Sequence, residues 1–193
     1  MSLVRALAFL RPGLAAARAR ARRVEMILMD VDGTLTDGTL AVLPDGEEVK
    51  SYNVRDGLGI LLAQLAGLRL GIISGKTSKA LERRAERLRI FELHQGILDK
   101  TKALGEILAK QALPAEAVAY IGDDLGDVEV MKSVGLAAAV ADAHPEVRRR
   151  AHYVCRAAGG RGAVRELIEF ILEAQGKWDG VKGRSGEVRN FNV

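Results

Sequence analysis

The chain has 193 residues and a formal net charge of +4, with 48% hydrophobic, 28% charged and 4% aromatic residues. This length suits one domain of ordinary size, and the composition is typical of a globular α/β protein. The scarcity of aromatic residues argues against a stacking platform for single-stranded nucleic acid, and the single cysteine, Cys155, excludes an internal disulfide.

The positive charge is concentrated at the start of the chain, where the first 24 residues carry six arginines and no acid. Removing these six from the 29 basic residues leaves 23 against 25 acidic ones, so the rest offers no basic stripe for a nucleic-acid backbone. The segment resembles an organelle transit peptide in lacking acids, but we favour a helical extension packed on the domain. Its apolar stretches, around Leu3, Leu7 and Leu10, are too short for a signal-peptide core or a membrane span, and arginines interrupt them. We therefore expect no nucleic-acid partner, no membrane and a cytoplasmic location.

The apolar run at residues 26–29 ends in two aspartates, Asp30 and Asp32, followed by a glycine. Continuous apolar runs are typical of buried strands in a parallel sheet, and ligands of such sheets bind outside the carboxyl ends of the strands. One carboxylate can attack a substrate while the other handles a proton. The alternative is that both aspartates only cap the strand and begin a turn.

Two strand-like runs follow, at residues 38–43 and 47–54, and Pro44-Asp45-Gly46 between them is turn chemistry. They predict a β-hairpin that projects from the carboxyl edge of the sheet, where it would cover the site or pair with another subunit. We predict Asp56 as the N-cap of a helix at 58–65. Arg55 is either a surface charge or an anion ligand.

A second apolar strand at 68–73 runs into Ser74, Gly75 and Lys76, and a helix is expected at 78–88. A hydroxyl, free backbone N–H groups and the positive end of a helix are the components of a phosphate site. Ser-Gly after a strand is also an ordinary turn, so this segment alone leaves both interpretations open.

Lys100 lies just before a helix expected at 103–111, after a weak strand at 92–98. A cation is disfavoured by the helix dipole at this end, so a nearby anion would explain the placement.

A further apolar strand at 118–122 ends in a second group of carboxylates that includes Asp123 and Asp127. Two strands that both end in acids bring several oxygens to one edge of the sheet, which suits Mg²⁺.

Strands at 134–141 and 153–155 and a helix at 162–174 complete the alternation of strands and helices. It predicts an α/β fold, a Rossmann-like three-layer sandwich with a parallel sheet, right-handed crossovers and no large cap domain. The end of the chain is polar and glycine-rich, so we read it as a flexible tail. The predicted divisions are 1–24, 25–175 and 176–193.

Four motifs stand at the ends of these predicted elements: Asp30-Val-Asp32-Gly-Thr34, Ser74-Gly75, Lys100 and Gly122-Asp-Asp-Leu-Gly-Asp127. In this order they resemble the haloacid dehalogenase superfamily of phosphohydrolases, over roughly residues 26–175. Other segments resemble its 3-deoxy-D-manno-octulosonate 8-phosphate phosphatase subfamily, which lacks a large cap: Asn53-Val-Arg-Asp-Gly57, Gly159-Gly-Arg-Gly-Ala-Val-Arg-Glu166 and Ala174-Gln-Gly-Lys177.

The resemblance implies a Mg²⁺-dependent phosphomonoesterase that acts on a sugar-acid phosphate in lipopolysaccharide sugar biosynthesis. Asp30 would attack phosphorus to give an aspartyl phosphate, and Asp32 would act as general acid and then base. Asp30, the backbone carbonyl of Asp32 and Asp123 would hold Mg²⁺, with support from Asp127.

The resemblance further implies that Ser74, Gly75 and Lys100 bind the phosphoryl group. Lys76 stands where most relatives have arginine, so Lys76 and Arg55 are the expected discriminators of the sugar acid. A homotetramer is implied, with the hairpin at 38–54 in its interface.

Four alternatives remain at this stage: a phosphatase for a nine-carbon sugar-acid phosphate, a dehalogenase, a response-regulator receiver and a non-catalytic oligomerisation module. A dehalogenase needs neither Asp32 nor a metal cluster. The acidic pair of a receiver precedes the phosphorylated aspartate by a strand, whereas Asp30 and Asp32 share one. The intact acids argue against the module.

Overall fold

The computed structural model describes residues 12–184 and 186–187. The parts of the predicted extension and tail at 1–11, 185 and 188–193 lie outside the described residues.

Six parallel strands form the central sheet, in the order β5-β4-β1-β6-β7-β8. The strands are β1 (Met26–Met29), β4 (Arg69–Ile73), β5 (Glu92–His94), β6 (Val118–Gly122), β7 (Leu136–Ala139) and β8 (Tyr153–Val154). Residues of the central strands β1, β6 and β7 are buried throughout, as their continuous apolar runs predicted. The predicted parallel sheet is confirmed.

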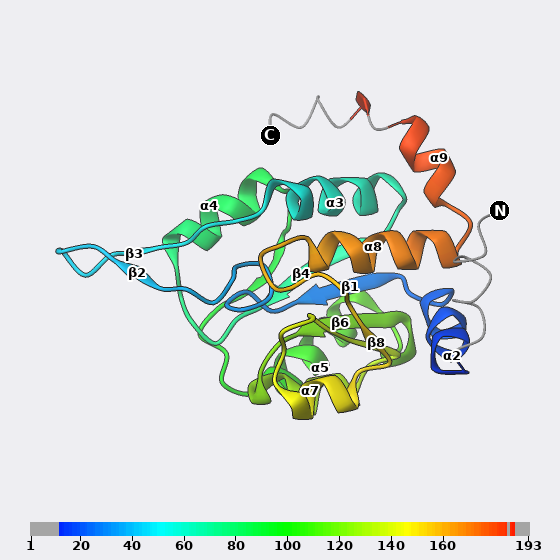
Figure 1. The fold of residues 1–193 in the computed structure, drawn as a ribbon, viewed down its shortest axis with the longest axis horizontal. Helices are drawn as coiled ribbons and strands as arrows, with labels where there is room; N and C mark the ends of the chain where they lie inside the picture. Colours follow the sequence, from blue (N-terminus) through cyan, green and yellow to red (C-terminus); the bar gives the residue numbers. More distant parts are fainter. Residues whose placement is uncertain (1–11, 185, 188–193) are drawn as a thin grey trace.

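Helices cover both faces of the sheet (Figure 1). They are α2 (Pro12–Ala21), α3 (Val54–Leu65), α4 (Lys79–Arg87), α5 (Lys100–Gln111), α6 (Val128–Lys132), α7 (Pro145–Arg150), α8 (Ala163–Ala174) and α9 (Trp178–Gly183), with short 3₁₀ turns at Ala115–Ala117 and Leu125–Asp127. Helices α3 and α8 pack side by side on one face, and α5 and α7 lie on the other (Figure 1). The three-layer α/β sandwich is therefore as predicted, and no large cap domain interrupts the described residues.

The hairpin after β1 consists of β2 (Ala41–Val42) and β3 (Glu48–Val49), which pair antiparallel and protrude from the body (Figure 1). Each strand has two residues, which is shorter than the predicted 38–43 and 47–54. An isolated pair of strands buries too little apolar surface to extend its ladder. The side chains of Leu40 and Val42 are accordingly exposed.

The predicted role of Asp56 as N-cap of the following helix is wrong. Helix α3 begins at Val54, and its N-cap is Asn53, whose side chain accepts a hydrogen bond from the Arg55 N–H at 2.9 Å. Asp56 is buried and accepts from the N–H groups of Gly162 (3.2 Å) and Arg165 (2.8 Å). It thus caps α8, a contact between segments over 100 residues apart that local sequence patterns do not reveal.

Both ends of the described chain are helical. Helix α2 buries Ala17 and Ala21 and packs on α8, and α9, where the sequence suggested only a flexible tail, buries Val181 and also packs on α8. The division at 24/25 and 175/176 remains a prediction. Within residues 12–184 and 186–187, no helix combines the length and apolar character needed to cross a membrane.

We predict that Asp56→Ala destabilises the protein by about 1–3 kcal/mol, because it removes a buried cap and leaves two N–H groups of α8 without an acceptor. Urea unfolding measures the change, and Glu106→Ala on the exposed face of α5 is the control. Equal stability of the two variants would contradict this role of Asp56.

Candidate active site

The register of the central strands brings the predicted motifs to one edge. Met29 of β1 pairs with Ile72 of β4 and with Ile121 of β6. Asp30 directly follows β1, Ser74 directly follows β4 and Asp123 directly follows β6. All three therefore lie at the carboxyl edge of the sheet.

Lys100, from the start of α5, lies between two carboxylates at this edge. Its Nζ is 2.5 Å from Asp30 Oδ1 and 2.6 Å from Asp127 Oδ1. It also donates to the hydroxyl of Tyr120 at 3.1 Å, and that hydroxyl donates to Asp127 at 2.6 Å. The anion that the sequence led us to expect near Lys100 is therefore a pair of aspartates.

Burial and mutual repulsion govern the charges of this group. Burial, together with the charge of Asp127, raises the pKa of Asp30 to about 6 although Lys100 opposes the shift. Burial, followed by the charges of Asp30 and Asp127, raises the pKa of Asp123 to about 8. Burial alone would lower the pKa of Lys100, but the charges of Asp30 and Asp127 outweigh it and raise that pKa.

Backbone and hydroxyl donors fix the second carboxylate group. Asp127 Oδ2 accepts from the N–H groups of Asp123 (2.9 Å) and Asp124 (3.2 Å), which ties the turn after β6 into one geometry. The hydroxyl of Thr34 donates to Asp123 Oδ1 at 3.1 Å. Asp123 is thereby oriented toward the loop after β1.

The residues present fit a hard divalent cation. Asp30, Asp123 and Asp127 each offer a carboxylate oxygen, and these oxygens lie within 4.8 Å of one another. All three are oxygen donors of the kind Mg²⁺ prefers. Burial, followed by mutual repulsion, raises the pKa of Asp30 and Asp123, and a bound cation relieves the repulsion.

The side chain of Asp32 lies outside this group of three. Its Oδ1 forms an ion pair with the ammonium of Lys50, which follows β3 of the hairpin. The Lys50 side chain is only 2% exposed, against 25% for that of Asp32. Sequence reasoning missed Lys50 because a lysine in a protruding hairpin carries no signal of burial.

Ser74 is buried directly after β4, and its Oγ accepts from the N–H of Lys76 at 3.3 Å. Gly75 beside it is exposed. Lys76 is also exposed and pairs with Glu48 of the hairpin at 3.7 Å, while Arg55 lies exposed on the first turn of α3. Neither Arg55 nor Lys76 bonds to the aspartates in the described part of the chain.

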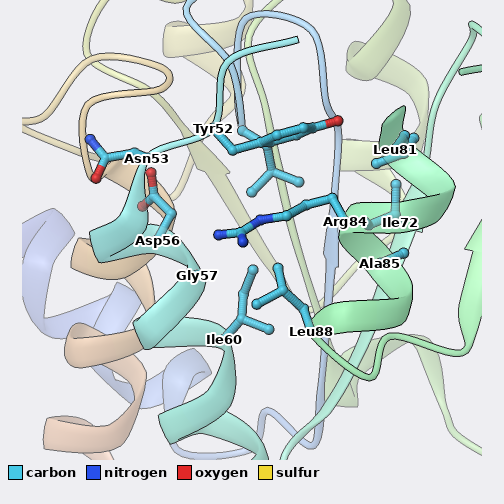
Figure 2. A pocket seen from close by; sticks show the side chains of 11 residues that line it. Tyr52, Asn53, Asp56, Gly57, Ile60, Ile72, Leu81, Arg84, Ala85 and Leu88 are labelled. Carbon is cyan, nitrogen blue, oxygen red and sulfur yellow. The ribbon is translucent and has the colours of Figure 1, made fainter. Parts of the chain in front are cut away.

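A narrow pocket of about 10 Å³ lies between α3 and α4 at the base of the hairpin (Figure 2). The guanidinium of Arg84 reaches across it toward Asp56, with the ring of Tyr52 on one side, 5.8 Å from Arg84 Cζ (Figure 2). A Cβ at Gly57 would lie 2.2 Å from Arg84 Nη2, so a side chain there would displace the guanidinium. Arg84, which the sequence did not single out, and Tyr52 thus join the hairpin base to α4.

Comparison with known proteins agrees with this arrangement. Residues 76–167 match the model of a family described as haloacid dehalogenase-like hydrolase. The chain is 48% identical over 174 residues to the 3-deoxy-D-manno-octulosonate 8-phosphate phosphatase KdsC of Escherichia coli strain B / BL21-DE3, covering 90% of this chain and 93% of that protein.

Solved structures are similar in fold as well as in sequence. A crystal structure of 3-deoxy-D-manno-octulosonate 8-phosphate phosphatase from Yersinia pestis aligns with a TM-score of 0.84 and 48% identity, covering 86% of this chain and 89% of that one. The Moraxella catarrhalis phosphatase, in complex with magnesium ion, phosphate ion and a KDO molecule, aligns with a TM-score of 0.85 and 36% identity, covering 87% and 97%.

We predict that Lys100→Met destabilises the metal-free protein by about 3–5 kcal/mol, because it leaves buried carboxylates without their cation. Added Mg²⁺ should then raise the unfolding temperature of the variant more than that of the wild type. Thermal unfolding with and without Mg²⁺ measures both effects, and exposed Lys102→Met is the control. An unchanged melting temperature of Lys100→Met without metal would refute the electrostatic account.

Proposed function

The chain belongs to the haloacid dehalogenase-like hydrolases and is a phosphatase, and from this premise we propose that it hydrolyses 3-deoxy-D-manno-octulosonate 8-phosphate. The assignment of this substrate rests on the 48% identity to KdsC over 90% of the chain. The KDO molecule bound by the Moraxella catarrhalis relative supports the same class of sugar acid. The dehalogenase, the receiver and the non-catalytic module are set aside, because the relatives are phosphatases.

We assign Asp30 as the nucleophile. Its carboxylate forms a bond to phosphorus while the bond from phosphorus to the sugar oxygen breaks, which leaves an aspartyl phosphate and splits one difficult hydrolysis into two steps. Water then attacks that phosphorus and regenerates Asp30. The support is the position of Asp30 at the strand end, where Lys100 orients its carboxylate.

Asp32 serves both steps as the proton-transfer group. It gives its proton to the departing sugar oxygen and then takes a proton from the attacking water, so it ends each cycle as it began. The separation of Asp32 from the other three carboxylates supports a role in proton transfer that is distinct from that of Asp30. The oxygens of Asp32 accept no hydrogen bond from Lys100 or from the turn after β6.

The cofactor is Mg²⁺, and the donor set described above fits it. Two of its carboxylates, Asp30 and Asp123, would hold the ion together with the backbone carbonyl of Asp32, and the ion would offset the repulsion between an anionic nucleophile and an anionic phosphate. Asp127 orients the N–H groups of the turn that carries Asp123.

Ser74, Gly75 and Lys100 bind the phosphoryl oxygens through a hydroxyl, a backbone N–H and a point charge. Lys76 and Arg55 are proposed to face the carboxylate of the sugar acid. Lysine lacks the bidentate fork of arginine, so a related nine-carbon sugar-acid phosphate is the second candidate substrate.

For the assembly we propose a homotetramer with the hairpin at 38–54 in the interface, and for the location the cytoplasm, in lipopolysaccharide sugar biosynthesis. The support for the interface is a group of exposed apolar side chains on the hairpin: Leu40, Val42, Leu43 and Val49. Pairing with another subunit would bury them and cover the carboxyl edge of the sheet near Asp30.

We predict that Asp30→Asn abolishes Mg²⁺-dependent phosphate release while the fold survives, because a neutral amide is not a nucleophile for phosphorus. Phosphate release from a panel of eight- and nine-carbon sugar-acid phosphates, with Mg²⁺ and with chelator, measures activity and substrate preference together. Hydrolysis by the pure Asp30→Asn variant at the wild-type rate would sink the assignment of Asp30. A preference of the wild type for the nine-carbon substrate would move the proposal to the second candidate.

We further predict that Val42→Glu dissociates the oligomer and lowers activity, since Val42 is 63% exposed on the hairpin and a charge there opposes burial. Phe91→Glu is the matched control, because Phe91 is 86% exposed and precedes β5, at the opposite edge of the sheet. Sedimentation of wild type and variants measures the change. A wild type that sediments as a fully active monomer would refute the proposed assembly.

A further inference from the structure

The segment that descends from the hairpin carries three side chains that face the body of the protein. Glu48 pairs with Lys76 at 3.7 Å, Lys50 pairs with Asp32, and the ring of Tyr52 lies against Arg84. The three are spaced two residues apart, which places them on one side of an extended chain. The residue between the first two, Val49, is 46% exposed. One face of the segment is therefore docked and the other is free.

The end of the segment is fixed as well. The side chain of Asn53 donates to the carbonyl of Gly160 at 3.1 Å and caps α3 through the N–H of Arg55. Lys50 thus lies between the surface ion pair of Glu48 with Lys76 and the anchored end of the segment at Asn53. Its ammonium is delivered to the site by a backbone that other contacts hold in place.

Lys50 is the donor that holds the Asp32 carboxylate, whereas different groups hold the other site carboxylates. Asp30 is next to Lys100, Asp123 accepts from Thr34, and Asp127 accepts from Lys100, Tyr120 and two backbone N–H groups. For Asp32, Lys50 is the sole hydrogen-bond or ion-pair partner of the carboxylate within residues 12–184 and 186–187.

We propose that Lys50 is a positioning residue for Asp32: by holding Oδ1 it fixes the carboxyl group so that Oδ2 faces the substrate for proton exchange. The inference rests on the proposed role of Asp32. An ammonium donor at Oδ1 is compatible with both states of the group, because in the neutral acid Oδ1 accepts as the carbonyl oxygen while Oδ2 carries the proton. Lys50 thereby ties the placement of the hairpin to the proton-transfer step, with no contact of its own to phosphorus.

The test uses two substrates whose leaving groups differ in how strongly their departure depends on protonation. A sugar phosphate releases a strongly basic alkoxide, whereas p-nitrophenyl phosphate releases a weakly basic phenolate. The ratio kcat/KM reports the steps up to departure of the leaving group, so the later hydrolysis of the aspartyl phosphate does not enter. General acid catalysis is worth about 10²–10⁴-fold.

We expect Lys50→Met to lower kcat/KM for the sugar phosphate by at least about 10-fold, within the range of that contribution, and to leave p-nitrophenyl phosphate within about 3-fold of wild type. Lys50→Arg should recover most of the loss, because a cation is restored. Exposed Lys79→Met on α4 is the control and should change neither substrate. Equal losses on both substrates would overturn the proposal, since they would mean that Lys50 binds the phosphoryl group or supports the fold.

A double-mutant cycle gives a second, independent decision. If Lys50 acts through Asp32, Lys50→Met adds nothing to the loss already caused by Asp32→Asn in turnover of the sugar phosphate. Additive losses would refute the proposal.

Failure of the proposed substrate is distinguishable from failure of this inference. A wild type inactive on 3-deoxy-D-manno-octulosonate 8-phosphate would overturn only the substrate assignment. The comparison of p-nitrophenyl phosphate with any alkyl phosphate that the enzyme accepts would still decide the role of Lys50.

Discussion

The repulsion among carboxylates gathered at one edge of the sheet is the constraint on which the rest of the site depends. Asp30, Asp123 and Asp127 bring oxygens within 4.8 Å of one another, and burial strengthens every interaction among them. Lys100 offsets part of this charge by contacting two of the three at once. The remaining negative charge is what suits the site to Mg²⁺ and, with the ion bound, to an anionic substrate.

Close packing of backbone around the site is the second requirement, and glycine supplies it at two positions. Gly33 has a φ of +93°, and a Cβ there would lie 2.1 Å from Asp123 Oδ2. A Cβ at Gly159 would lie 1.7 Å from the carbonyl oxygen of Gly33. The loop after β1 is thus pressed between the turn after β6 and the loop before α8, and Asp56, by capping α8, holds that last loop from the other side. The segment Gly159-Gly-Arg-Gly-Ala-Val-Arg-Glu166, which resembles the phosphatase subfamily, therefore has a structural role: its glycine at 159 lets it pack against the loop after β1.

The sequence predicted the parallel sheet well, because buried strands such as 118–122 are continuous apolar runs that end abruptly in charged residues. Because residues that follow parallel strands lie at the carboxyl edge of the sheet, the same pattern also predicted that Asp30 and Asp123 lie at one edge. Contacts between distant segments were not predicted. Asp56 has the local sequence pattern of an N-cap for α3 but caps α8, and Lys50 has the sequence context of an exposed lysine although its side chain is buried against Asp32. Tyr120 was hidden inside an apolar strand, where its hydroxyl gives no periodic signal. Spacing along the chain reveals which elements form, whereas side-chain pairing across the fold depends on packing that local patterns do not encode.

The central claim is that this phosphatase transfers the phosphoryl group first to Asp30. The most direct measurement is to mix the Asp32→Asn variant with Mg²⁺ and p-nitrophenyl phosphate, whose phenolate departs without a proton, quench in acid and identify the modified peptide by mass spectrometry. Because only hydrolysis of the intermediate then needs Asp32, the intermediate should accumulate, and the account predicts a phosphoryl group on Asp30. A phosphoryl group on another residue, or nitrophenolate release in the same mixture with Asp30 unmodified throughout, would contradict it.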